Sequence, residues 1–333
     1  MYWRLQMLDI NRELKEKIAN VSSSLESKYK NIFSLDKYQL RDLIKNNIGE
    51  IKKMKKLGNE TLTKYQKQGG IVGVDGSNNK VGGAFPHYIE IYQALAKSTF
   101  MKDKPLFKTD IYTPLLTESL GNLLESEENK NEDKKNERLA TLEVEAAIAS
   151  IDKLKPYAIM MDGGLIRYNI YSGDKWTELK TRCEEEGIIL FGIIKDIKTS
   201  IIADTLIEQN KGIDRRIYDR EILFGVLDYG EMILIQEFAN KKESQGYASV
   251  FLRSSLQPSV IGMDIIDSQR EHLEEMANLV FTLTPENSRG VPLWLDIVDQ
   301  EVKLTDQMTK SLLETHMDRE IYQRFFLSER AKR

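Results

Sequence analysis

The sequence is poor in the residues that form disulfides and hold transition metals. Its 333 residues include one cysteine, Cys183, and three scattered histidines. One cysteine excludes an intramolecular disulfide and a cysteine-rich zinc site, and three separated histidines exclude a histidine-cluster site. We therefore expect any bound metal to be held mainly by carboxylates.

Long apolar runs and a dominant charge are also missing. No hydrophobic run approaches the ~18 residues of a membrane span, and charge interrupts the N-terminus too early for a signal peptide. Lys and Arg number 48 against 52 Asp and Glu, and the pI is about 5.7. This balance argues against nucleic-acid binding by bulk attraction and leaves a local groove as the route to DNA. We predict a soluble, cytoplasmic globular protein with no membrane partner.

Residues 1–68 form a polar segment without proline that favours helix. Apolar residues such as Ile10, Leu14 and Ile18 recur at spacings of four, which predicts long helices. Two interpretations of this helical N-terminal arm stay open. The arm either serves dimerisation or docking of a partner, or it is a helical cap on the core.

Beyond residue 70 the pattern becomes that of an α/β protein. Five strands are predicted, at 71–75, 88–95, 106–112, 157–162 and 188–194, and helices at 138–154 and 175–186 separate the last three. Three adjacent strands followed by two helix-separated strands indicate a mixed sheet flanked by helices. This is the order of a ribonuclease H-like core, placed at about 70–200.

The remaining part of the chain predicts further strands and a last helical region. Further strands are expected at 222–226, 232–236 and 248–252, and Pro292 opens a last helical region. The charged stretch 125–137 is expected to be a solvated loop or a helix extension. The basic and aromatic end of the chain suits either a contact with DNA or a partner, or an amphipathic terminal helix.

Three carboxylates stand out in this arrangement. Asp75 and Asp162 each sit where an apolar strand runs into glycine, at the strand edge where such sheets commonly place their chemistry. Each alone is also explained as an ordinary turn. Glu143 falls near the middle of the apolar face of its predicted helix, where a carboxylate is costly unless it is paired or bound to a cation.

If that helix packs on the sheet, the three acids converge. Clustered carboxylates without histidine or cysteine are typical of a Mg²⁺ or Mn²⁺ site. Two such ions activate water and stabilise the leaving oxygen of a phosphodiester, which is nuclease chemistry. A buried ion pair involving Glu143 is the structural alternative.

Five ordered motifs resemble those of the NurA nuclease family. The resemblance covers residues 71–306 and lies in these segments: Gly73-Val-Asp75-Gly-Ser77, the helix with Glu143, Met161-Asp162-Gly-Gly-Leu165, Gly192-Ile-Ile-Lys195, and Pro292-Leu-Trp-Leu295 with Asp299. It implies a NurA nuclease domain at 69–310 and a C-terminal helical tail at 311–333. It also implies a homodimer and a DNA nuclease, with endonuclease or 5′–3′ exonuclease activity, that works with a HerA-type hexameric ATPase in DNA end processing or anti-phage defence.

The resemblance also assigns roles to residues. Asp75, Glu143 and Asp162 match metal-binding and catalytic acids, with Mn²⁺ or Mg²⁺ as cofactor and two ions expected. Lys195 matches a basic residue that contacts phosphate or the transition state. Asp299 stands where many members place histidine, so the fourth metal ligand is either Asp299 or Asp296, or Asp299 is an ordinary solvent-facing helix residue.

Two interpretations stay open for the residues that follow the motif with Asp162. Arg167 and Tyr168 are candidates to grip phosphate and stack on an unpaired base, or they are ordinary packing residues. Gly164 replaces a serine that is frequent in the family, which we expect to change little.

No Gly-x-x-x-x-Gly-Lys-[Ser/Thr] loop occurs, so energy from ATP must come from the partner. The alternative function is a catalytically inactive subunit that organises an ATPase ring.

Overall fold

A single nine-stranded sheet forms the frame of the protein. The computed structural model describes residues 12–100, 104–117, 128–209, 217–239 and 242–327. The strands are β1 (Gly49–Lys53), β2 (Ile71–Gly82), β3 (Tyr88–Ser98), β4 (Leu106–Tyr112), β5 (Ala158–Asp162), β6 (Ile189–Ile194), β7 (Glu231–Ile235), β8 (Tyr247–Leu252) and β9 (Ile261–Ile266). Their order across the sheet is β1-β7-β8-β9-β6-β5-β2-β3-β4.

The half of the sheet from β4 to β6 is the predicted core. Strands β2, β3 and β4 form an antiparallel meander, and β5 and β6 follow in parallel with β2. In the parallel register Val74 lies beside Met161, which is the last pair before Asp75 and Asp162. The predicted mixed sheet flanked by helices is confirmed, as are all five predicted core strands. The fold is ribonuclease H-like.

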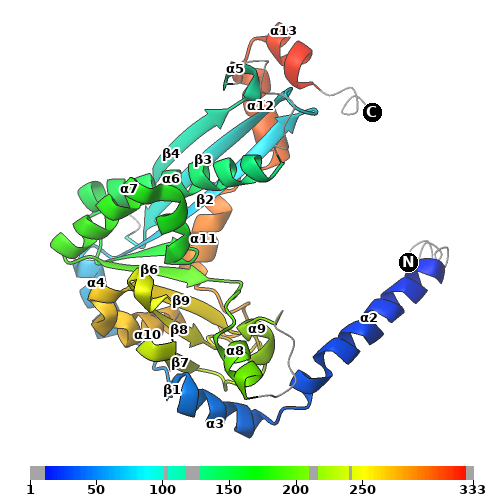
Figure 1. Ribbon diagram of the computed structural model, residues 1–333. Helices are drawn as coiled ribbons and strands as arrows, with labels where there is room; N and C mark the ends of the chain where they lie inside the picture. Colours follow the sequence, from blue (N-terminus) through cyan, green and yellow to red (C-terminus); the bar gives the residue numbers. More distant parts are fainter. Residues whose placement is uncertain (1–11, 101–103, 118–127, 210–216, 240–241, 328–333) are drawn as a thin grey trace.

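Helices cover both faces of this sheet (Figure 1). The α-helices of the described ranges are α2 (Arg12–Phe33), α3 (Lys37–Asn47), α4 (Asn59–Lys67), α5 (Pro114–Thr117), α6 (Glu128–Leu154), α7 (Leu165–Glu185), α8 (Ile201–Glu208), α9 (Asp219–Ile222), α10 (Leu273–Leu283), α11 (Leu293–Val302), α12 (Asp306–His316) and α13 (Arg319–Ile321). Of these, α2 extends away from the sheet (Figure 1). Helix α6 contacts β2, β3 and β4, whereas α11 contacts β2 and β3.

Strand β5 shows how the two layers are built. Ile159 and Met161 pack into the cluster that contains the buried side of α6 and α7, whereas Ala158 and Met160 pack into the cluster with α10 and Leu295 of α11. Because side chains alternate between the faces of a strand, a strand buried on both faces is apolar at nearly every position. This explains the continuous apolar runs in the sequence.

The N-terminal segment differs from the helical expectation. Gly49–Lys53 is a strand, β1, that pairs antiparallel with β7 at the edge of the sheet. The segment is short and charged, as is common for edge strands, so it carries no visible alternation of apolar residues. The predicted helices on either side of it are present as α2, α3 and α4.

The second half of the sheet was predicted less well. The strands expected at 232–236 and 248–252 are present as β7 and β8, but the prediction at 222–226 is wrong. There the chain forms the end of α9 and a turn at Gly225, which has a φ of 77°. Ile222, Leu223 and Val226 are apolar because they pack against α3 and α8, not because they lie in the sheet. Strand β9 was not predicted.

Two helices begin earlier than expected. The described part of the charged stretch 125–137 is the first part of α6, while residues 125–127 lie outside the described residues. Helix α7 starts at Leu165, ten residues before the predicted start at 175, and non-helical backbone at Gly173 kinks it two residues before that predicted start. None of the helices in the described ranges is long and apolar enough to cross a membrane.

Candidate active site

Two of the predicted acids meet at one edge of the sheet. Asp75 in β2 and Asp162 at the end of β5 follow the last paired residues of two parallel neighbours. Asp75 is buried at 7% exposure, and one of its carboxylate oxygens accepts a hydrogen bond of 2.7 Å from the backbone N–H of Gly76. The parallel pairing of the strands is therefore what brings these two carboxylates together.

Helix α11 adds a third carboxylate, that of Asp299. One carboxylate oxygen each of Asp75, Asp162 and Asp299 lies within 4.8 Å of the others. The helix approaches β2 closely at Gly73, where a Cβ would lie 3.0 Å from Val298 and 3.1 Å from Trp294. The absence of a side chain at position 73 thus lets α11 carry Asp299 to the strand ends.

The alternative ligand on this helix has another partner. Asp296 accepts a 2.6 Å ion-pair contact from Arg289. It lies one turn before Asp299, and among the described residues the cluster of converging acids contains Asp299 and not Asp296. Of the two candidates that the sequence leaves open, the geometry favours Asp299, whose role as a ligand stays a prediction.

Glu143 approaches the same strand from the opposite face. A Cβ at Gly76 would lie 2.5 Å from Oε1 of Glu143, and since strand side chains alternate, Asp75 points to the other face. Glu143 is 1% exposed and is held by Arg167, whose guanidinium donates to its two oxygens at 2.8 and 3.4 Å. The structure therefore shows Glu143 in the buried ion pair that the sequence kept as an alternative, next to the acid cluster.

Tyr168 is a support for this site and not a surface residue. It is fully buried, its ring stacks on Trp176 with centroids 5.6 Å apart, and its hydroxyl donates to the backbone carbonyl of Asp162 at 3.1 Å. A buried ring has no free face on which a base can stack, so the predicted DNA contact of Tyr168 is wrong. Its hydrogen bond instead positions the end of β5.

Lys195 directly follows β6 and reaches Asp162. Its ammonium group forms an ion pair with the Asp162 carboxylate, and its side chain is 25% exposed. The positive charge that pairs with this carboxylate is thus on a side chain that also reaches the surface. This placement suits the predicted contact with a phosphate.

Burial raises the pKa of three of these acids, Asp75, Asp162 and Glu143. Burial raises the pKa of Asp75 to about 9, with Asp162 and Glu143 adding to the rise. Burial also raises the pKa of Asp162, although Lys195 opposes this, and the pKa of Glu143, although Arg167 opposes it. Carboxylates that repel one another at close range gain most from a divalent cation, and oxygen donors are what Mg²⁺ and Mn²⁺ prefer.

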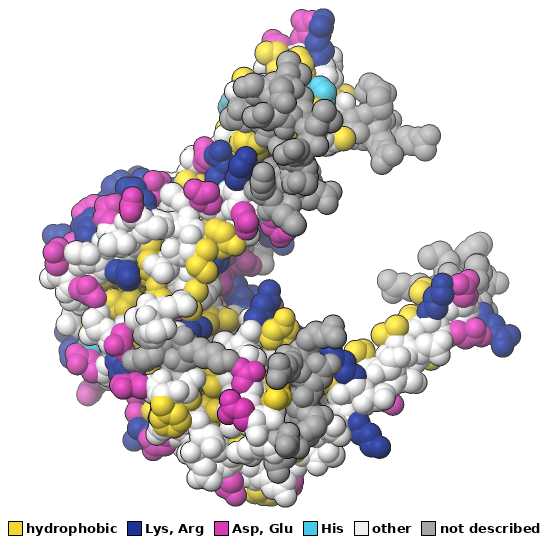
Figure 2. Space-filling view, viewed as in Figure 1, with side chains coloured by type: hydrophobic (Ala, Val, Ile, Leu, Met, Phe, Trp, Pro, Cys, Tyr) yellow, Lys and Arg dark blue, Asp and Glu magenta, His cyan; other side chains and the backbone are white. Residues whose placement is uncertain are grey.

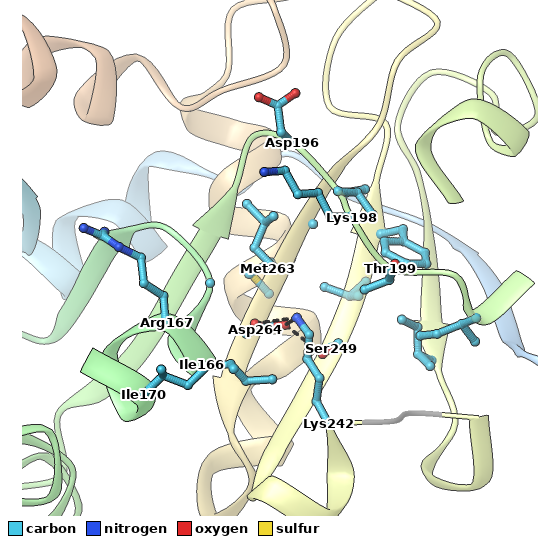
Figure 3. A pocket seen from close by; sticks show the side chains of 18 of the residues that line it. Ile166, Arg167, Ile170, Asp196, Lys198, Thr199, Lys242, Ser249, Met263 and Asp264 are labelled. Atoms are coloured by element: carbon cyan, nitrogen blue, oxygen red, sulfur yellow. Dashed lines mark hydrogen bonds and ion pairs between the residues drawn. The ribbon is translucent and has the colours of Figure 1, made fainter. Parts of the chain in front are cut away.

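A pocket of about 520 Å³ adjoins the acids at Arg167 (Figure 3). Its walls are largely apolar, and Lys198 and Asp196 stand at its upper rim in this view. At its floor the fully buried Asp264 accepts from Lys242 at 2.7 Å and from Ser249 at 2.7 Å. These polar residues were missed because β9 was not predicted, although an Asp inside the apolar run 260–266 was a signal.

Comparisons with known proteins agree with this geometry. A family model described as the NurA domain matches residues 69–304. No curated protein matches the chain. Among solved structures, the NurA nuclease from Sulfolobus solfataricus is similar at a TM-score of 0.54 and 14% identity, covering 93% of this chain and 95% of that one.

Two endonuclease V structures are less similar. The enzyme from Bacillus subtilis matches at a TM-score of 0.39 and 15% identity, covering 85% of this chain and 96% of that one. The catalytic domain of human endonuclease V matches at a TM-score of 0.39 and 14% identity, covering 83% and 95%.

Proposed function

Because this chain belongs to the NurA domain family, a family of nucleases, we propose that it is a metal-dependent DNA nuclease that hydrolyses phosphodiester bonds by a two-metal mechanism. The observation that carries this proposal is the convergence of Asp75, Asp162 and Asp299 from β2, β5 and α11. We further propose that it acts on DNA in the cytoplasm as a homodimer. In this proposal a HerA-type hexameric ATPase is its partner in DNA end processing or anti-phage defence.

The three aspartates are proposed to hold Mn²⁺ or Mg²⁺. They fit such an ion because each offers an oxygen within 4.8 Å of the other two, and because the raised pKa of the buried Asp75 shows that its negative charge is disfavoured without a cation. A bound ion lowers the pKa of water and stabilises negative charge on a phosphate. Glu143 is the proposed additional ligand for a second ion, and Arg167 now occupies its oxygens.

The other residues of the site bind and orient. Lys195 is proposed to contact a phosphate oxygen, since its ammonium lies at the Asp162 carboxylate and its side chain is partly exposed. Arg167 fixes Glu143 and also lines the adjoining pocket, so it is placed to contact a phosphate on that side. The Tyr168 hydroxyl fixes the main chain at Asp162 by donating a hydrogen bond to its carbonyl. Each of these groups is fixed before the substrate arrives, which favours stabilisation of the transition state.

The proposal is tested by DNA cleavage with matched variants. End-labelled linear and circular DNA, single- and double-stranded, is incubated with Mn²⁺, Mg²⁺ or EDTA, with and without a HerA-type ATPase. We expect Asp75→Asn and Asp299→Asn to reduce metal-dependent cleavage about 100-fold or more. Asp296→Asn, one turn from Asp299 and paired with Arg289, is the control and should stay within about 3-fold of wild type.

Each outcome separates the readings. Cleavage of circles indicates endonuclease activity, and products that shorten only from linear ends indicate an exonuclease and its polarity. Equal activity of wild type and Asp299→Asn would overturn the assignment of Asp299. No cleavage under any condition, with binding of the ATPase retained, would favour the inactive structural subunit.

A further inference from the structure

Helix α2 carries a row of exposed apolar side chains. Leu14, Ile18, Val21 and Leu25 are 52%, 61%, 58% and 49% exposed. The helix extends away from the sheet, and hydrophobic side chains follow one of its edges (Figures 1 and 2). Helices in proteins gain most of their stability from packing an apolar face, and an exposed apolar row of this kind usually marks a binding surface.

The spacing of the row identifies the kind of surface. The steps from Leu14 to Ile18, Val21 and Leu25 are four, three and four residues. These are the alternating core positions of a heptad repeat, which form the seam of a coiled coil. Ser23 falls on the opposite, outward side of the helix. The row is therefore suited to another helix, not to a sheet or a flat protein surface.

The row is also complementary to itself when it is reversed. Read backwards, the steps are again four, three and four. A two-fold axis that passes between Ala19 and Asn20 places Leu14 opposite the partner's Leu25 and Ile18 opposite the partner's Val21. Every apolar residue then meets an apolar residue, which is the condition for a symmetric interface between two copies.

Charge favours this antiparallel direction over a parallel one. The next seam position after Leu25 is Lys28, and parallel pairing in register would place it against the partner's Lys28. Antiparallel pairing keeps these lysines far apart and brings Lys15 to the same flank as the partner's Glu26. It also sets the two helix dipoles in opposite directions.

A groove at the base of α2 continues the apolar surface. It measures about 650 Å³ and is lined by Leu25, Tyr29 and Ile32 of α2 together with Phe224, which is 63% exposed. Since Leu25 lies opposite the partner's Leu14 in the antiparallel arrangement, the N-terminal end of the partner helix arrives at this groove. The seam and the groove thus form one surface.

We propose that α2 pairs with α2 of a second copy of this chain in an antiparallel two-stranded coiled coil centred between Ala19 and Asn20. The proposal gives the homodimer of the proposed function its interface and rests on that function only for the expectation of two subunits. It does not involve the acids, so cleavage and pairing are measured independently.

Disulfide cross-linking of the full chain tests the direction. Leu14 and Leu25 are 11 residues apart, about 16 Å along a helix, whereas a disulfide requires Cα atoms within about 7 Å. We expect Leu14→Cys and Leu25→Cys each to give little cross-linked dimer alone and to cross-link at least about 10-fold more when mixed. The native Cys183 is buried, and burial raises its pKa to about 12, so it does not compete. Cross-linking of each variant alone and not in the mixture would indicate parallel pairing and overturn the proposal.

Molar mass measured by light scattering tests the seam. Wild type is expected at twice 38.4 kDa. Ile18→Asp and Val21→Asp are expected to be monomeric, while the outward control Ser23→Asp stays dimeric. Two results would overturn the pairing: a wild type that is monomeric at about 50 µM, a concentration at which even a weak coiled coil would be populated, or an Ile18→Asp variant that is dimeric.

Circular dichroism and DNA cleavage by the same samples report folding and function. A chain that cross-links as expected but cleaves nothing refutes the proposed function and leaves the pairing intact.

Discussion

Gly76 makes room for Glu143. A Cβ at position 76 would lie 2.5 Å from Oε1 of Glu143 and 2.8 Å from Cδ1 of Leu139, so any other residue here must displace these two side chains. The buried carboxylate therefore reaches the strand that carries Asp75 through the space that a glycine leaves.

Substituting this glycine is expected to disturb both packing and activity. Gly76→Ala should cost about 1–3 kcal/mol of stability by overpacking. The displacement of Glu143 should reduce metal-dependent cleavage on the order of 100-fold. Urea unfolding and cleavage assays measure the two effects. Gly83→Ala, whose Cβ would have its nearest neighbour at 3.8 Å, is the control and should change neither. Full activity of Gly76→Ala would contradict the role given to Glu143.

The ion pair of Arg167 and Glu143 predicts a double-mutant result. Arg167→Met leaves a buried carboxylate without its partner, which should cost about 3–5 kcal/mol. Because burial raises the pKa of Glu143, its unpaired carboxyl takes up a proton more readily as the pH falls, so this loss should be smaller at pH 5 than at pH 8. Adding Glu143→Gln should recover most of the stability but not the activity. Urea unfolding at both pH values checks this, and additive losses in the double variant would argue against the pair.

Asp75 predicts how stability depends on pH and metal. The folded pKa of about 9 lies above the ordinary value of 3.8, so the folded state binds this proton more tightly. The resulting stabilisation is complete below about pH 4 and is lost as the pH rises through about 9. Without divalent ions, Asp75→Asn should thus raise the Tm at pH 8 by about 2–4 °C, roughly 1 kcal/mol for a chain of this size.

Divalent ions should reverse that trend. Since an ion binds the deprotonated carboxylates, Mg²⁺ should raise the Tm of wild type more at pH 8.5 than at pH 5.5. Asp75→Asn should reduce this increase at both pH values. A Tm increase that is equal at the two pH values in wild type would mean that Mg²⁺ binds elsewhere.

Asp219 predicts a stability effect remote from the acid cluster. Its buried carboxylate accepts hydrogen bonds from the backbone N–H groups of Ile201, Ile202 and Ala203 at 2.8, 2.8 and 3.2 Å, and so caps α8 from a distant part of the chain. Asp219→Ala should cost about 2–4 kcal/mol in urea unfolding, and Asp219→Asn clearly less.

The matched control for this cap is the residue at the helix start. Ser200 precedes α8 but makes no side-chain cap hydrogen bond. Ser200→Ala should therefore lose less than about 1 kcal/mol. If it lost as much as Asp219→Ala, the cap would not be the source of the effect.

The sequence by itself determined the core sheet and two of the three clustered aspartates, Asp75 and Asp162. Continuous apolar runs predict strands buried on both faces, and Asp75 and Asp162 each stand where such a run meets glycine. The parallel pairing of β2 with β5 then brings the two to one edge. Periodicity also placed Glu143 on the buried face of α6. These features are local, because each depends on the spacing of residues within one element.

Only the tertiary structure decided which distant groups meet. Asp299 joins the cluster because Gly73 leaves space for the close approach of α11. Glu143 of α6 forms an ion pair with Arg167 of α7. The ring of Tyr168 is buried and stacks on Trp176. The edge strand β1 exists because β7 offers it backbone partners. Periodicity gives the face that a residue occupies but not the element that packs there, so such long-range pairs follow only from the packed fold.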